Sequence, residues 1–208
     1  MNILYNAKLG DGFMHMSNSN VNAKMGFMSK NLEYLLYKLK MCLESGFSCT
    51  DISMGVSGYT GSADIYRFYV RVSPAITSVY KTPVEDVLRD LSKEDLAVWF
   101  LDDGSYHCRR NTMHLYCNSL SEDQVVVLQD RIFELYGIRP NLYWDKKKDG
   151  RKYPYLYYPR ELVKKAQEDV ISVIRSNSLY SMNYKTGHLA FSESEKPSTT
   201  NEQIQDAG

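Results

Sequence analysis

An apolar stretch at residues 96–101 ends at two carboxylates and a glycine, residues 102–104. Ser92, followed by Asp95 three residues later, is the signal of a capped helix N-terminus, so the pattern predicts a helix that begins directly after the serine. Its apolar residues cover almost the whole circumference, which predicts burial on nearly every side. Gly104 is expected to end the helix in the left-handed conformation that glycine adopts without steric cost.

Carboxylates at the C-terminus of a helix face the negative end of the helix dipole, an arrangement that costs about 0.3–1 kcal/mol per charge. A divalent cation would remove this cost, because it neutralises the carboxylates and takes their oxygens as ligands. The alternative for this segment alone is a solvated Asp-Asp-Gly turn after a core helix.

The same pattern occurs near the start of the chain, where a short apolar helix is predicted to run into Asp11 and Gly12. Asp11 and Asp103 lie 92 positions apart, and a serine that opens a helical segment recurs at this spacing, at positions 29 and 121. Tyr-Lys-Thr occurs at residues 80–82 and again at residues 184–186. Matches in one order and at nearly one spacing indicate an internal duplication.

Each half shows the same order of predicted elements after its first helix. In the first half these are a hairpin over 13–29 with its turn at 17–20, a helix over 30–44 with an apolar face of leucines, a hairpin over 51–72 and a short helix after Pro74. In the second half they are a hairpin over 105–118, a helix over 121–136, a hairpin over 139–158 and a helix from Pro159 to about Arg175.

The order predicts an α+β fold of two pseudo-symmetric αββαββα repeats, each with a four-stranded antiparallel sheet. We expect the repeats at residues 1–82 and 93–191, with a linker at 83–92. Residues 192–208 are polar and poor in apolar side chains, which predicts a disordered tail.

The formal net charge of the 208 residues is zero, from 25 basic and 25 acidic side chains. The tail is acidic, so the rest of the chain is mildly basic, which is compatible with a DNA partner without being diagnostic. The cysteines do not have a zinc-site spacing, and no apolar run approaches the length of a membrane span. With no targeting peptide apparent, we expect an intracellular protein of bacterial or phage cytoplasm, or an organelle-encoded one.

The second motif, Leu96-Ala97-x-Trp99-Phe100-x-Asp102-Asp103-Gly104, resembles the signature of the LAGLIDADG homing endonucleases in their single-chain, two-repeat form. The first motif ends in Leu9-Gly10-Asp11-Gly12 and departs from the signature at Asn6, where small residues usually let the two motif helices touch. The similarity extends over residues 3–185. It implies two central motif helices side by side at a pseudo-twofold axis, with the two sheets forming a saddle on DNA.

The resemblance also implies a set of site residues. Asp11 and Asp103 would be direct ligands of Mg²⁺, for which Mn²⁺ could substitute and Ca²⁺ could bind without supporting cleavage. Gly10 and Asp102, which precede these aspartates, are further candidate metal ligands. Lys81 and Lys185 of the repeated Tyr-Lys-Thr would be active-site lysines. Lys30 and Ser121 would be polar residues that order water.

Basic side chains on the predicted strands and turns are candidates for contacts with DNA. On the strand over 65–72, Tyr66, Phe68 and Val70 point to one face and the residues between them point to the other. One face can therefore pack in the core while the other meets phosphates. The tip of the last hairpin is basic and flanked by aromatic residues, which suits a duplex backbone, although a solvated loop is the alternative. The candidates are Arg67, Arg71, Arg109, Lys146, Lys147, Lys148, Arg151 and Lys152.

With the resemblance, the sequence predicts a monomeric, site-specific double-strand DNA endonuclease that depends on Mg²⁺, and the resemblance implies that it recognises a long site. Two alternatives share the fold. An RNA maturase would bind intron RNA and could keep both aspartates, whereas a non-catalytic DNA-binding regulator would be expected to have lost one of them.

Overall fold

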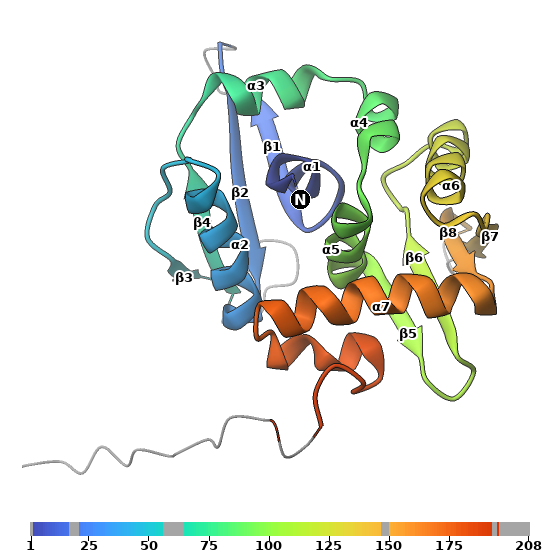
Figure 1. The fold of residues 1–208 in the computed structure, drawn as a ribbon. Helices are drawn as coiled ribbons and strands as arrows, with labels where there is room; N and C mark the ends of the chain where they lie inside the picture. The colour runs from blue at the N-terminus through green and yellow to red at the C-terminus, as the bar shows by residue number, and fades with distance from the viewer. Residues whose placement is uncertain (1, 17–20, 56–64, 147–149, 193–194, 196–208) are drawn as a thin grey trace, which may run out of the picture.

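The chain folds into two halves of similar architecture around a central pair of helices (Figure 1). The computed structural model describes residues 2–16, 21–55, 65–146, 150–192 and 195. The first half contains α1 (Ile3–Leu9), β1 (Gly12–Met16), β2 (Ala23–Ser29), α2 (Leu32–Glu44), β3 (Ser53–Gly55), β4 (Ile65–Val70) and α3 (Pro74–Lys81).

The second half repeats this order. It contains α5 (Lys93–Asp103), β5 (Gly104–His107), β6 (Thr112–Tyr116), α6 (Glu122–Tyr136), β7 (Asn141–Lys146), β8 (Lys152–Tyr158), α7 (Arg160–Ser176) and a 3₁₀ helix, η1 (Tyr180–Thr186). Each half forms one antiparallel four-stranded sheet, in the orders β1-β2-β4-β3 and β5-β6-β8-β7. The predicted fold class is confirmed.

Helix α5 lies at the centre of the molecule, as its apolar circumference predicts. Every residue from Leu96 to Leu101 is buried, and the relative exposure of Val98 and Trp99 is at most 1%. The predicted capping box is present, because the Ser92 side chain accepts from the amide of Asp95 and the Asp95 side chain accepts from the amide of Ser92. Burial on all sides makes α5 a rigid support for the carboxylates at its end.

The expected conformation of Gly104 is wrong. Its backbone is extended, with φ of −90° and ψ of 158°, and β5 begins at this residue without a turn. Glycine is nevertheless required, because a Cβ here would lie 2.2 Å from the Phe100 ring and 2.4 Å from the Phe100 carbonyl oxygen. A close approach between strand and helix, rather than a positive φ, explains this glycine.

Two further features differ from the sequence-based expectation. The segment between the halves forms a helix, α4 (Val84–Asp90), which packs against α6. The buried face of α2 carries Tyr34, Lys38 and Cys42 beside Leu35, while the leucines at 32, 36 and 43 are exposed. The two Tyr-Lys-Thr copies lie in different elements, the first at the end of α3 and the second in η1. The predicted turn at 17–20, residues 56–64 between β3 and β4, and almost all of the polar tail lie outside the described residues.

None of the helices in the described ranges is long and apolar enough to cross a membrane.

Candidate active site at the ends of the motif helices

Helices α1 and α5 run in the same direction and are joined by two hydrogen bonds. At their N-termini, the Asn2 amide donates to Asp95 Oδ1 over 2.6 Å. Further along, Asn6 Nδ2, from the middle of α1, donates over 2.7 Å to Oδ2 of Asp102, the penultimate residue of α5. Asn6, the departure from the family signature, is thus a hydrogen-bonding residue of the helix contact and is 3% exposed. The pairing brings the end of α5 beside the segment that carries Asp11.

Asp103, the last residue of α5, is a partly buried carboxyl whose acidity is strongly perturbed. Loss of solvation raises its pKa to about 7, and the charges of Asp11 and Asp102 add to the effect. Trp99, one helical turn earlier, donates from Nε1 to Asp103 Oδ2 over 3.1 Å and so fixes the orientation of the carboxyl group. A carboxylate that lies close to other carboxylates is stabilised when a cation binds beside it.

Asp11 occupies the equivalent position after α1 and is more exposed than Asp103. Desolvation and the neighbouring charge of Asp102 raise its pKa, and Lys38 and Lys185 act in the opposite direction. Its backbone amide donates to Asp102 Oδ2 over 3.2 Å. The two predicted aspartates therefore belong to one electrostatic cluster that also includes two lysines.

Asp102, between these aspartates, is enclosed by hydrogen-bond donors. Its Oδ1 accepts from Lys38 Nζ at 2.5 Å and from the Tyr34 hydroxyl at 2.8 Å. Its Oδ2 accepts from Asn6 Nδ2 and from the Asp11 amide. The side chains of Lys38 and Asp102 are 3% and 0% exposed. Both oxygens are engaged with protein groups, so Asp102 has the environment of a structural anchor rather than that of a reserve metal ligand.

Of the two lysines expected from the repeated Tyr-Lys-Thr, the structure brings one to the aspartates. Lys185 is 9% exposed, and its Nζ donates to the Gly104 carbonyl at 2.7 Å and to the Asp102 carbonyl at 3.3 Å. Burial lowers its pKa, and the charges of Asp11, Asp102 and Asp103 offset part of that effect. Lys81 is exposed at the end of α3, where the side chain of Lys8 reaches the carbonyls of the final turn instead.

Lys30 and Ser121 are not brought into this cluster by any described contact. Lys30 is exposed between β2 and α2. Ser121 is the N-cap of α6, with its hydroxyl oxygen accepting from the Gln124 amide over 3.3 Å. Gln124 in turn donates to Glu85 of α4 over 2.8 Å. This capping role is sufficient to explain why a serine occupies position 121, and no catalytic role is needed.

The residues present fit a hard divalent cation that takes part of its coordination shell from elsewhere. Within the described parts of the chain, no group of three or more His, Cys, Asp and Glu side chains is arranged to hold a metal. Asp11 and Asp103 provide two carboxylates, and a cation of the Mg²⁺ type is commonly bound by one or two carboxylates together with waters and substrate phosphates. The carbonyl of Gly10 could add a third oxygen, and burial together with the charges of Asp11 and Asp102 raises the pKa of Asp103, so a cation would relieve its unfavourable ionisation.

The pKa of Asp103 predicts how cation binding depends on pH. A carboxyl binds the cation after losing its proton, so the apparent affinity for Ca²⁺ should fall about tenfold per pH unit below 7 and level off above it. Calorimetric titration between pH 5.5 and 8.5 measures this. Without metal, the folded protein holds this proton more tightly than the unfolded chain, so stability should decrease as the pH rises from about 4 to 7. Asp103→Asn should remove the part of both dependences that comes from this carboxyl group, leaving the part from Asp11, whose pKa is also raised.

The two sheets have open faces of different chemistry, formed by the side chains that alternate with the core residues. On the second sheet, rings from all four strands form a continuous layer with centroids 5.2–5.9 Å apart: His107, His114, Tyr116, Tyr143, Tyr155 and Tyr157. On the first sheet, Phe13 lies over Gly26 beside Tyr69, and Lys24 and Arg67 share the face.

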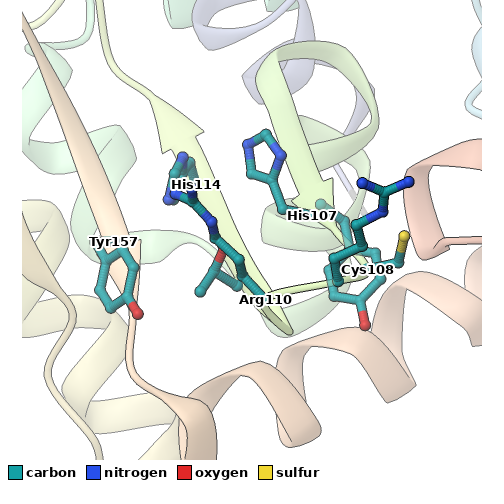
Figure 2. A pocket seen from close by; sticks show the side chains of 8 residues that line it. His107, Cys108, Arg110, His114 and Tyr157 are labelled. Carbon is teal, nitrogen blue, oxygen red and sulfur yellow. The ribbon is translucent and has the colours of Figure 1, made fainter.

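A hollow of about 620 Å³ opens at the β5–β6 turn, at the edge of the ring layer (Figure 2). His107, His114 and Tyr157 line it from three neighbouring strands, and Arg109 and Arg110 line it from the turn. Both arginines are exposed. Arginines beside polar rings suit contacts with phosphate oxygens.

The other basic candidates have varied positions. Arg67 lies on the open face, and its Nε is buried without a hydrogen-bond partner in the described part of the chain. Arg71 is exposed just after β4. Lys146 and Lys152 are cross-strand partners at the end of the last hairpin, next to the exposed Arg151. Lys147 and Lys148 lie outside the described residues.

Four residues of the cluster were not predicted from the sequence as site residues: Asn6, Tyr34, Lys38 and Trp99. Lys38 did leave a signal, because it follows Leu35 by three residues and precedes Cys42 by four, which places a charge on the buried face of α2. A lysine on such a face needs an acidic partner, and Asp102 is that partner.

Comparisons with known proteins agree with the fold. The model of the LAGLIDADG DNA endonuclease family matches residues 1–165. The fold is similar to that of the homing endonuclease I-WcaI bound to its DNA recognition sequence, with a TM-score of 0.66, 17% identity and coverage of 88% of this chain and 83% of that one. No curated protein matches the chain.

Two other solved structures show the same fold at lower similarity. An I-DmoI variant in complex with its target DNA in the presence of Mn has a TM-score of 0.54 and 9% identity, covering 81% of this chain and 91% of that one. The N-terminal LAGLIDADG domain of DUF199/WhiA has a TM-score of 0.50 and 11% identity, with 81% of each chain covered.

Paired motif helices that end in carboxylates between two antiparallel sheets define the LAGLIDADG class of fold. The chain belongs to the LAGLIDADG DNA endonuclease family.

Proposed function

We propose that this protein is a site-specific double-strand DNA endonuclease that hydrolyses phosphodiester bonds with Mg²⁺ or Mn²⁺. The observation that carries the proposal is the convergence of Asp11 and Asp103 at the ends of α1 and α5, where the charge of Asp11 helps to raise the pKa of Asp103 to about 7. Carboxylates that destabilise one another and lie between two open sheets are suited to a cation and a phosphodiester.

A divalent cation held by Asp11 and Asp103 would stabilise negative charge on the phosphate and lower the pKa of an attacking water. The protein groups supply orientation and charge balance. Trp99 holds the carboxyl of Asp103, and Lys185 fixes the carbonyls on either side of it. The ammonium of Lys185 also provides positive charge beside the carboxylates, where a phosphate would otherwise be repelled.

The partner that best suits the open faces is duplex DNA. Two-stranded ribbons fit the major groove, and the side chains of an open face can reach base edges there. Arg67, on the open face of the first sheet, is the candidate for a base contact, while Arg109 and Arg110 beside the hollow are candidates for phosphate contacts.

An RNA maturase on the same fold is the second candidate, and the ring layer of the second sheet favours it. Aromatic side chains across a four-stranded sheet can stack unpaired bases, which is how many sheets bind single-stranded RNA. A non-catalytic regulator has weaker support, because both aspartates and their supporting contacts are present.

The deciding experiment is selection of cleaved molecules from a randomised double-stranded library with Mg²⁺, with EDTA as the control. Enrichment and cutting of one long site in Mg²⁺ would establish the nuclease. If the wild type enriches a duplex but never cuts it, the chain is a binding protein. Nanomolar binding of a folded intron RNA without cleavage of the intronless DNA would establish the maturase.

Arg109→Ala is expected to weaken binding to all duplexes to a similar degree. Loss of one phosphate contact releases one fewer counterion, so the slope of log affinity against log salt should change by about 0.9. Arg67→Ala is the matched comparison, because a base contact is worth about 1–3 kcal/mol for the preferred base only. Fluorescence anisotropy at several salt concentrations, with cognate and substituted sites, distinguishes a phosphate contact from a base contact. Equal salt slopes for Arg109→Ala and wild type would exclude the phosphate contact.

A further inference from the structure

The two aspartates of the site are supported in different ways, although the halves of the protein are related by duplication. The Asp103 carboxyl is held directly by Trp99 within its own helix. The residue 92 positions before Trp99 is Ala7, which has no hydrogen-bonding side chain. The support of Asp11 instead comes from the other half of the molecule, through the contact between its amide and Asp102 Oδ2.

The residues that precede the two aspartates form a complementary pair. Asp102 precedes Asp103, and Gly10 precedes Asp11. A Cβ on Gly10 would lie 2.1 Å from Asp102 Oδ2 and 3.2 Å from Asn6 Nδ2. The glycine therefore leaves the space into which the Asp102 carboxylate extends from the other motif. This arrangement exists once in the molecule, since the first motif has no carboxylate to extend in the opposite direction.

Lys38 determines which oxygen of the Asp102 carboxylate contacts the Asp11 amide. Its ammonium and the Tyr34 hydroxyl both contact Oδ1, so Oδ2 is left to accept from Asn6 and from the Asp11 amide. The ammonium also lies 4.7 Å from the Tyr34 ring centroid and 5.2 Å from that of Phe27. A buried ion pair in such an enclosure has few alternative conformations.

We propose that Asp102, anchored by Lys38, is a positioning residue that fixes the backbone of Asp11 across the interface between the motif helices. The two halves of the centre consequently depend on different residues, and loss of Asp102 impairs the function of Asp11 before that of Asp103. The effect on cleavage rests on the proposed nuclease function, whereas the effect on the Asp11 backbone does not.

Asp102→Asn tests the proposal because an amide cannot satisfy both sides of the pocket. With its oxygen towards Lys38, its NH₂ group meets the donors of Asn6 and Asp11; in the reverse orientation, the NH₂ group meets the ammonium. Adding Lys38→Met removes this conflict, since the amide oxygen can then turn towards the Asp11 amide and the NH₂ group can donate to the Tyr34 hydroxyl. The double variant should therefore regain the hydrogen bond to the Asp11 amide that Asp102→Asn loses.

The first measurement is hydrogen exchange of the Asp11 amide in the metal-free protein, by NMR. Asp102→Asn should accelerate exchange about tenfold, as expected for one hydrogen bond, and the double variant should return most of the way to the wild-type rate. Asp95→Asn is the matched control, because Asp95 is also buried and accepts from Asn2 of the other motif helix, at the far end of the pair. That variant should leave the Asp11 amide unchanged.

The second measurement is cleavage of a duplex labelled on each strand separately. If Asp11→Asn and Asp103→Asn prefer opposite strands, Asp102→Asn should show the preference of Asp11→Asn in weaker form. Unchanged exchange of the Asp11 amide in Asp102→Asn would overturn the proposal. Exchange in the double variant that stays as fast as in Asp102→Asn would also overturn it, because Asp102 would then act through its charge. If the wild type cuts no DNA, the nuclease proposal fails and the exchange data still decide the role of Asp102.

Discussion

Asp103→Asn is expected to abolish double-strand cleavage, with a rate loss on the order of a thousand-fold or more, the equivalent of several kcal/mol of charge stabilisation. Asparagine is nearly isosteric with aspartate, and the Trp99 indole can still donate to its amide oxygen, so the fold should persist. The substitution would remove one of the two negative charges proposed to hold the divalent cation. Supercoiled plasmid with a single target site distinguishes intact, nicked and linear products.

Asp11→Asn is the companion experiment. If the two carboxylates act on one cation, each substitution should impair both strands; if each serves its own strand, both variants should become nicking enzymes with opposite strand preference. Asp86→Asn is the control, because Asp86 is an exposed carboxyl on α4 whose partner is Arg89. Normal linear product from Asp103→Asn would show that the cation is bound elsewhere and would remove the main support of the nuclease proposal.

The two carboxylates could be located from the sequence because the signals that place them are local. A capping box begins α5, a buried apolar run continues it and the chain direction puts Asp103 at its end. The duplication then predicts a second such helix and, by pseudo-symmetry, its position beside the first. Hairpins and sheet order follow from alternation along the strands and short connections.

The contacts around the carboxylates could not be located in this way because they break the symmetry of the duplication. Lys81 and Lys185 occupy equivalent places in the sequence, yet Lys185 is buried beside Asp103 and Lys81 is exposed. The order of helices and strands repeats, but the backbone differs at these lysines, because Lys81 ends α3 and Lys185 lies in η1. Lys38 approaches Asp102 from a helix 64 positions away, a relation that no local pattern encodes.

The apolar face of α2 illustrates how periodicity can mislead. Five leucines at helical spacing predicted the core face, but the helix is turned so that Leu36 and Leu43 are 48% and 54% exposed while Tyr34 and Lys38 face inward. With Lys38 facing inward, its ammonium pairs with Asp102 and lies over the rings of Phe27 and Tyr34. The buried face of α2 therefore includes polar side chains, which a pattern of leucines does not locate.

Lys38→Met is expected to lower the free energy of unfolding by about 3–5 kcal/mol, because it leaves the Asp102 carboxylate buried without its cation. Methionine fills much of the lysine volume, so the loss should come from the unpaired charge rather than from a cavity. Urea unfolding followed by circular dichroism measures it. The double variant with Asp102→Asn contains no buried charge at this place and should recover most of the loss.

Lys40→Met is the matched control on the same helix. Lys40 forms an ion pair with Glu44 at 3.7 Å, with both side chains more than 60% exposed, and such pairs contribute about 0–1 kcal/mol. A loss in Lys38→Met no greater than in Lys40→Met would contradict the anchoring role of the buried pair. A large loss that the second substitution reverses would show that charge balance at this position, more than packing, holds α2 against the motif helices and keeps the site in shape.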